Sequence, residues 1–228
     1  MAIRGVIFDF NGTLLWDGEK NEASWRAFAL RHAGRTITDE EFLDLHGRPN
    51  REWIGFLLGY IPADPADGLA LAEEKEVIYR QMCLNDREGF CLAPGAPQLL
   101  DELVARGIPH GIATSAEIEN VDFYFRHLGL QRWFERRWVI YNDHSLPGKP
   151  NPDFYQAAAR AIGLESAECA VVEDAPIGVL AAHNAGVGRI VGIAPEGSRL
   201  LRNNPYIDLL VEDFTGAQRW LDALRTDA

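Results

Sequence analysis

Cysteine is scarce in this chain of 228 residues, and its few copies are not arranged for metal binding or disulfide pairing. There are three cysteines, an odd number, and Cys83, Cys91 and Cys169 fall in no Cys-x-x-Cys or Cys/His spacing typical of zinc ligands. The sequence therefore argues against a disulfide framework and a structural zinc site. We interpret all three as ordinary apolar side chains of the interior.

Positive charge is also in short supply. The 22 Lys and Arg residues face 34 Asp and Glu, which gives a formal net charge of -12. A nucleic-acid surface needs a basic stripe, so this balance disfavours a nucleic-acid partner. An acidic chain can still bind phosphate at one local site, and Lys149 is one of its few lysines.

Long hydrophobic runs are missing. No stretch reaches the roughly 18 apolar residues of a membrane span, and the first ten residues, MAIRGVIFDF, lack the uncharged apolar run of a signal peptide. We therefore expect a cytoplasmic protein without a membrane partner. Nothing in the sequence indicates an oligomeric state. With 47% hydrophobic residues, the chain can bury one substantial core and a smaller second one.

Short β-branched and aromatic runs alternate with helix-period segments over most of the chain. Such runs are typical of buried parallel strands, and the alternation predicts an α/β fold with a doubly wound, Rossmann-like parallel sheet. The expected strands are Ile3–Phe10, His110–Thr114, Trp138–Tyr141, Cys169–Asp174, Arg189–Ile193 and Ile207–Val211. The expected helices between and after them are Ala96–Arg106, Glu119–Leu128, Pro152–Ile162, Ile177–Ala185 and Gly216–Leu224.

The alternation is interrupted after the first strand by a region with helical patterns only. Thr38 precedes three acidic residues and is therefore expected to be a helix N-cap. We predict a small all-α cap over residues 16–90, inserted in a core formed by residues 1–15 and 91–228, and we expect it to act as a lid. Its expected helices are Glu22–His32, Asp39–Leu45, Asn50–Leu58 and Pro65–Asn85.

Polar residues stand at the expected carboxyl ends of the strands, where open α/β sheets bind ligands. Asp9 and Thr114 each close a strand, Lys149 follows a third, and Glu173 and Asp174 close a fourth. Singly, each has an ordinary interpretation, such as a turn residue, a helix cap or a solvated loop charge. Together, carboxylates that can hold a divalent cation and a hydroxyl and an ammonium that can hold phosphate oxygens indicate a phosphoryl site.

Several segments carry a resemblance to the haloacid dehalogenase superfamily that covers essentially the whole chain. They are Asp9–Leu14 (DFNGTL), Ala113–Ser115 (ATS), Gly148–Asp153 (GKPNPD), Val172–Gly178 (VEDAPIG) and Ala181–Gly186 (AAHNAG). The chain is similar in particular to the branch of β-phosphoglucomutase and phosphoglycolate phosphatase, in which a small helical cap follows the first motif. The resemblance implies hydrolysis of phosphate monoesters or acyl phosphates of a small phosphorylated metabolite through an aspartyl-phosphate.

The resemblance also implies a Mg²⁺ site. Asp9 would be both nucleophile and ligand, the backbone carbonyl of Asn11 and the Asp174 carboxylate would complete the protein ligands, and Glu173 would support them. Two carboxylates and a carbonyl are hard oxygen donors of the kind that Mg²⁺ requires.

The same resemblance assigns the phosphate-holding groups. Thr114, with Ser115 beside it, and the backbone N–H groups near Phe10 and Asn11 would hold the transferring oxygens. Lys149 would neutralise the charge that develops in the reaction.

Asn11 is the departure from the family pattern, which has Asp two residues after the nucleophile. A carboxamide can donate a hydrogen bond but cannot transfer a proton. General acid–base catalysis, which typically raises the reaction rate by roughly 10²–10⁴-fold, should therefore be missing. Deamidation of the Asn11-Gly12 pair would restore a carboxylate, although a folded chain usually resists it.

Three consequences of Asn11 stay open. The chain could be a specialised hydrolase of acyl or aryl phosphates, or it could take a proton from the cap, where Asp17, Glu19, Glu22 and His46 are the nearest candidates. It could also be a binding or regulatory protein that keeps Mg²⁺ and phosphate without turnover.

Other activities of the family are less well supported. A mutase would have a His in the first cap helix, but Asn21 stands there. Dehalogenation would not need the Glu173–Asp174 pair. Phosphonate cleavage would need a cap lysine, and of the two present we interpret Lys75 as part of a solvated helix face and find no support for Lys20.

The cap loop Leu45–Arg51 corresponds to the family's substrate-selecting loop. His46 and Arg48 are therefore candidates for binding a second anionic or sugar group of the substrate. The alternative is that His46 ends a helix before Gly47 and that Arg48 is a surface residue.

Overall fold

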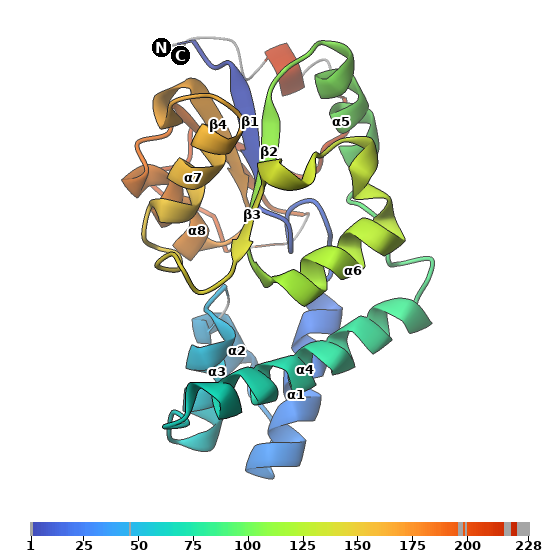
Figure 1. Ribbon diagram of the computed structural model, residues 1–228, viewed down its shortest axis with the longest axis vertical. Helices are drawn as coiled ribbons and strands as arrows, with labels where there is room; N and C mark the ends of the chain where they lie inside the picture. The colour runs from blue at the N-terminus through green and yellow to red at the C-terminus, as the bar shows by residue number, and fades with distance from the viewer. Residues whose placement is uncertain (1, 46, 196–197, 199, 217–219, 223–228) are drawn as a thin grey trace. The chain divides into compact units, whose positions relative to one another are not determined.

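The computed structural model describes residues 2–45, 47–195, 198, 200–216 and 220–222. The chain divides into two compact units, residues 1–16 with 92–228, which we call the core unit, and residues 17–91, the helical unit (Figure 1). None of the described helices is both long and apolar enough to cross a membrane.

The core unit is a parallel sheet with helices on both faces, which confirms the predicted α/β class (Figure 1). In sheet order its strands are β3 (Val139–Asn142), β2 (His110–Glu117), β1 (Gly5–Phe8), β4 (Cys169–Glu173), β5 (Arg189–Ile193) and β6 (Leu209–Val211). Helices α7 (Asp153–Ala161) and α8 (Pro176–Asn184) lie on one side, and α5 (Ala96–Ala105) and α6 (Ile118–Leu128) on the other. The 3₁₀ turns are η1 (Leu130–Arg132), η2 (Arg136–Trp138) and η3 (Ser166–Glu168).

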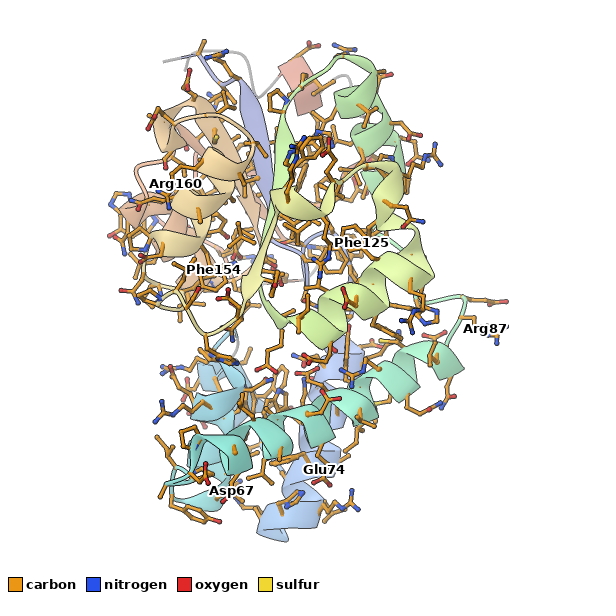
Figure 2. The ribbon with its side chains drawn as sticks, viewed as in Figure 1. Asp67, Glu74, Arg87, Phe125, Phe154 and Arg160 are labelled. Carbon is orange, nitrogen blue, oxygen red and sulfur yellow. The ribbon has the colours of Figure 1, made fainter. Side chains whose placement is uncertain are left out.

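The central strands are apolar on both faces because helices cover both. All four residues of β1 and all five of β4 are buried. On one face, Phe154 of α7 and Val179 of α8 pack in a cluster with Ile7 and Val171, whereas Arg160 of α7 is exposed (Figure 2).

One strand ends later than expected, and one expected helix is only partly described. Strand β2 does not end at Thr114 but continues to Glu117, because its register shifts after Ala113 and Glu117 then pairs with Asn142 of β3. The helix expected over Gly216–Leu224 extends outside the described residues.

The helical unit consists of α1 (Gly18–Ala33), α2 (Asp39–Leu45), α3 (Asn50–Leu58) and α4 (Pro65–Asn85). Thr38 caps α2 as predicted: its Oγ1 accepts a hydrogen bond from the Glu41 N–H at 3.2 Å, and the Glu41 carboxylate accepts one from the Thr38 N–H at 2.9 Å. This reciprocal pair is a capping box. Trp25 stacks on Trp53 at 4.7 Å at the centre of the unit's own apolar cluster.

The interpretation of Cys91 as a buried side chain is wrong. Cys83 and Cys169 are buried, and burial raises the pKa of their thiols to about 11 and about 12 respectively. Cys91 is exposed because it lies in the bend after α4, outside any helix or strand.

The expectation that Lys75 lies on a solvated face is also wrong. Lys75 is only 2% exposed, and its ammonium donates hydrogen bonds to Asn21 Oδ1 at 2.7 Å and to Glu76 Oε1 at 3.0 Å. The ring of Trp25 lies 5.0 Å from the ammonium, and Asn50 donates a further hydrogen bond to Glu76 at 3.0 Å. The acidic residues next to Lys75 in the sequence suggested a solvated face. Its inward orientation depends instead on the packing of α1, α3 and α4.

Replacing Lys75 should destabilise the helical unit. We expect Lys75→Met to reduce its stability by roughly 3–5 kcal/mol, because the Glu76 carboxylate would then be buried without its counter-charge. The measurement is hydrogen-exchange protection of the α1 and α4 amides in the whole chain.

The control is Lys20→Met, which removes a lysine whose partner Asp86 is half exposed, at a Nζ–Oδ2 distance of 2.8 Å. We expect a change below about 1 kcal/mol there. Adding Glu76→Gln to Lys75→Met should restore part of the protection, and no restoration would contradict the buried-charge explanation.

Candidate active site

The carboxyl ends of β1 and β4 place Asp9 beside Glu173. The two strands pair in parallel with Phe8 opposite Val172, and the Asp9 N–H donates to the Val172 carbonyl at 3.0 Å. Asp9 follows the last residue of β1, and Glu173 is the last residue of β4. Adjacent parallel strands therefore bring together carboxylates that are 164 positions apart in the sequence.

Lys149 lies between these two carboxylates. Its ammonium donates to Asp9 Oδ1 at 2.6 Å and to Glu173 Oε1 at 2.7 Å, and the residue is 6% exposed. It is therefore not a solvated loop charge. Burial by itself would lower the pKa of Lys149, but the negative charges of Asp9 and Glu173 raise it well above its usual range. The side chain thus stays cationic.

Glu173 is held by more groups than sequence reasoning identified. Tyr155 of α7 donates to its Oε1 at 2.9 Å, and the Ala175 N–H donates to its Oε2 at 2.8 Å. Burial and the charge of Glu173 raise the pKa of Tyr155 well above its usual range, so its phenol keeps its proton. The only sequence signal for Tyr155 was its place in the helix that follows the GKPNPD segment.

Asp174 lies next to this cluster and accepts a hydrogen bond from Thr13 Oγ1 at 2.9 Å. Gly12 has a φ of 83°, and a Cβ at this position would overlap the Asp174 carboxylate, so only glycine lets the turn pass so close. Burial, then the charges of Glu173 and Asp9, raise the pKa of Asp174 well above its usual range.

The cluster suits a hard divalent cation. Asp9, Glu173 and Asp174 each offer a carboxylate oxygen, and these atoms all lie within 4.8 Å of one another. The single ammonium of Lys149 offsets one of the three negative charges. Oxygen donors with an excess of negative charge are what Mg²⁺ requires, so the residues present fit this ion.

Phe10 and Asn11 follow Asp9 in the chain, and both contact Tyr124 of α6. The Asn11 Nδ2 donates to the Tyr124 hydroxyl at 2.8 Å, and the Phe10 ring stacks on the Tyr124 ring at 4.6 Å. Sequence reasoning did not identify Tyr124, because a helical aromatic residue is usually part of the apolar core.

The remaining predicted residues of the core unit lie on β2. Thr114 is buried, and its hydroxyl accepts a hydrogen bond from the Ala116 N–H at 3.1 Å, so it does not cap α6, which begins later at Ile118. It follows Ile112, which pairs with Phe8 of β1, by two positions. Ser115 is half-buried.

His46 and Arg48 are the two predicted substrate-binding residues of the helical unit. His46 lies outside the described residues. Arg48 is exposed; its guanidinium forms an ion pair with Glu52 at 2.9 Å, and its Nε donates to the Asp44 carbonyl at 3.1 Å.

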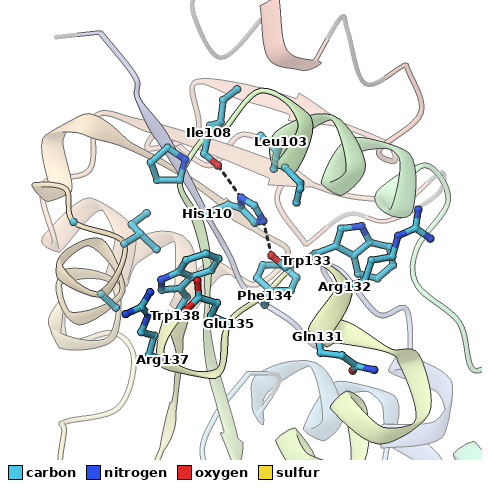
Figure 3. A pocket seen from close by; sticks show the side chains of 16 residues that line it. Leu103, Ile108, His110, Gln131, Arg132, Trp133, Phe134, Glu135, Arg137 and Trp138 are labelled. Carbon is cyan, nitrogen blue, oxygen red and sulfur yellow. Dashed lines mark hydrogen bonds and ion pairs between the residues drawn. The ribbon is translucent and has the colours of Figure 1, made fainter.

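A separate pocket of about 660 Å³ lies at the opposite, amino-terminal edge of the sheet (Figure 3). Trp133, Phe134 and Trp138 line it, and His110 at its centre has one ring nitrogen 2.8 Å from the Ile108 carbonyl and the other 2.9 Å from that of Trp133. The polar atoms of His110 are therefore engaged by the backbone, and the pocket adds no reactive group to the carboxylate cluster.

Comparison with known proteins identifies similar chains over nearly the whole length. Residues 3–186 match the family model of haloacid dehalogenase-like hydrolases. Hexitol phosphatase A of Escherichia coli is 33% identical over 86% of this chain and 85% of its own. Fructose-1-phosphate phosphatase YqaB of the same organism is 30% identical over 82% of this chain and 94% of its own.

A solved structure agrees in fold. The HAD hydrolase, family IA, variant 3, of Entamoeba histolytica superposes with a TM-score of 0.87 at 33% identity, and the match covers 97% of this chain and 99% of that one.

Removing one charge from the cluster should stabilise the metal-free chain. In EDTA at pH 7 we expect Asp174→Asn to melt about 2–4 °C above the native protein, equivalent to roughly 1 kcal/mol, because Asn keeps an acceptor for Thr13 without the negative charge. A raised pKa of a folded-state carboxyl means that its stabilising effect is lost as pH rises, so the difference should shrink toward pH 4.

Mg²⁺ should reverse this order. At about 100 times its Kd the ion would stabilise the native chain by about 2.7 kcal/mol, and it should raise the melting temperature of the variant far less. Asp122→Asn, which changes an exposed partner of Arg136, should behave as the native chain does. An Asp174→Asn chain that melts below the native one in EDTA at pH 7 would contradict this account.

Proposed function

The chain belongs to the haloacid dehalogenase-like hydrolases, and on that premise we propose that it is a Mg²⁺-dependent phosphatase of small phosphorylated sugars or sugar alcohols. The observation that carries the proposal is the buried arrangement of Asp9, Lys149 and Glu173 with Asp174 beside it. The names of the two Escherichia coli relatives, a hexitol phosphatase and a fructose-1-phosphate phosphatase, support the substrate class.

Asp9 is the proposed nucleophile. Its carboxylate oxygen attacks phosphorus, a bond forms between that oxygen and phosphorus, and the bond from phosphorus to the leaving-group oxygen breaks. Lys149, at 2.6 Å, favours the ionised carboxylate and faces the charge that the phosphoryl group brings. Glu173, held by Tyr155 and the Ala175 N–H, positions Lys149.

Asp9 and Asp174, with the Asn11 carbonyl, are the proposed protein ligands of Mg²⁺, and Glu173 supports them. When bound, the ion would supply positive charge to the phosphoryl oxygens. Thr114, with Ser115 beside it, and the backbone N–H groups at Phe10 and Asn11 are the proposed donors to the same oxygens.

Water completes the reaction. It attacks phosphorus of the aspartyl-phosphate, the bond between phosphorus and the Asp9 oxygen breaks, and the carboxylate is restored. Over the two steps one water is consumed, one of its protons goes to the leaving alcohol, and inorganic phosphate leaves.

Asn11 limits which leaving groups can depart readily. Its carboxamide cannot deliver a proton, so we expect sugar and sugar-alcohol phosphates to turn over slowly, and acyl or aryl phosphates, whose leaving oxygens depart as anions, to turn over faster. The alternative that Asn11 itself favours is a protein that binds Mg²⁺ and a phosphorylated metabolite with little turnover. A mutase is a weaker alternative, since Asn21, which replaces the His of that branch, accepts a hydrogen bond from Lys75.

The decisive comparison is magnesium-dependent phosphate release from an aryl phosphate and from a hexitol phosphate. The variants are native, Asn11→Asp and, as the blank, Asp9→Asn. We expect native activity above the blank on both substrates, and higher on the aryl phosphate. We expect Asn11→Asp to raise kcat on the hexitol phosphate by roughly 10²-fold or more, because it restores a proton-transferring group.

If only Asn11→Asp turns over, the alternative of a binding protein replaces the phosphatase proposal. Peptide mapping of the active native preparation should find intact Asn11; a deamidated fraction that accounted for the activity would assign turnover to the aspartyl form.

We also propose that the helical unit acts as the cap that selects the substrate, and that His46 and Arg48 bind the sugar or second anionic group. Arg48→Ala should raise KM for the hexitol phosphate about tenfold, which corresponds to about 1.4 kcal/mol, and leave KM for the aryl phosphate unchanged. Arg31→Ala is the matched control, because Arg31 is also an exposed arginine in an ion pair, with Glu74 at 2.6 Å. Equal changes in KM for both substrates would argue against a selecting role.

A further inference from the structure

The side chain of Asn11 is held by a residue 113 positions away. Its Nδ2 donates a hydrogen bond to the Tyr124 hydroxyl at 2.8 Å. Tyr124 is itself only 1% exposed, and its ring is stacked on Phe10 at 4.6 Å and meets the edge of Phe123 at 5.8 Å. A hydroxyl on a ring packed in this way has one position, so it can hold the Asn11 carboxamide in one orientation.

The backbone around Asn11 is held as well. The Gly12 N–H donates to the Leu15 carbonyl at 2.8 Å, and the Leu15 N–H donates to the Phe10 carbonyl at 2.9 Å. The last side-chain torsion of asparagine is broad and roughly two-fold when nothing restrains it. With the backbone held in the turn, the hydrogen bond to Tyr124 restrains that torsion.

A carboxamide nitrogen carries two N–H groups in one plane. When one of them points to Tyr124, the direction of the other is set. A donor with a fixed direction stabilises a developing negative charge better than one that must reorient during the reaction.

We propose that Tyr124 is a positioning residue that holds the Asn11 carboxamide so that its second N–H donates to the leaving-group oxygen. This inference rests on the proposed phosphatase function and gives Asn11 a part in it. No proton is transferred: the hydrogen bond stabilises the departing oxygen anion, which then takes a proton from water. The contribution of this hydrogen bond to the rate therefore grows as the leaving group becomes more basic: it is small for an aryl phosphate and larger for a sugar-alcohol phosphate.

The kinetic test is Tyr124→Phe, which removes the hydroxyl and keeps the ring that stacks on Phe10. With a hexitol phosphate we expect kcat to fall about tenfold with KM unchanged, less than the roughly 10²–10³ lost when an oxyanion donor is itself deleted. With an aryl phosphate we expect no change. Asn11→Ala should show the same substrate dependence, and Asn11→Ala/Tyr124→Phe should lose no more than Asn11→Ala alone.

A loss of the same size with both substrates, or losses that add in the double variant, would overturn the inference, because either result means that Tyr124 acts through general packing. Tyr206→Phe is the control, since it removes the hydroxyl of an exposed tyrosine of the core unit. It should leave both substrates unaffected.

A second measurement does not depend on turnover. In ¹H–¹⁵N NMR spectra the side-chain NH₂ signals of Asn11, assigned by their loss in Asn11→Ala, should move in Tyr124→Phe and stay in place in Tyr206→Phe. Unmoved signals in Tyr124→Phe would overturn the inference whatever the kinetics show. If the native protein has no activity above Asp9→Asn, the phosphatase proposal fails and with it the donation to a leaving group, whereas the NMR result still decides whether Tyr124 holds Asn11.

Discussion

The buried ion pair of Lys149 with Asp9 and Glu173 is the interaction on which the rest of the site depends. Burying any one of these three charged groups alone would cost desolvation free energy. The ammonium of Lys149 offsets that cost because it lies 2.6 Å from Asp9 and 2.7 Å from Glu173. Tyr155 and the Ala175 N–H donate further hydrogen bonds to Glu173. Asp174 adds a third carboxylate beside this ion pair, and the three carboxylates together fit a divalent cation.

Close backbone approach makes this concentration of charge possible. A Cβ at Gly12 would overlap Asp174, and a Cβ at Gly178 would overlap the Glu173 carboxylate. Gly12 lies in the turn after β1, and Gly178 lies in the first turn of α8, the helix that follows β4. A larger residue at either position would displace a carboxylate. The carboxylates can therefore keep their places only if both positions are glycine.

Asn11 and Lys75 both form hydrogen bonds that their neighbours in the sequence do not indicate. At Asn11 a carboxamide, which cannot transfer a proton, donates a hydrogen bond to the Tyr124 hydroxyl. At Lys75 a residue surrounded in sequence by acids turns inward to Asn21 and Glu76. In both cases the chemistry follows from a contact with a helix distant in sequence.

The sequence by itself determined the α/β class, the strand order along the chain, the capping of α2 by Thr38, and the strand-end positions of Asp9, Lys149, Glu173 and Asp174. These features depend on local periodicity, turn chemistry and the rule that parallel strands end at one edge. Only the tertiary structure decided that Lys149 is buried between two carboxylates, that Tyr155 and Tyr124 hold Glu173 and Asn11, and that Lys75 points inward. The physical reason is that the burial and the hydrogen-bond partners of these residues depend on tertiary packing. The sequence pattern predicts which face of a helix is apolar, but it does not identify the element against which that face packs.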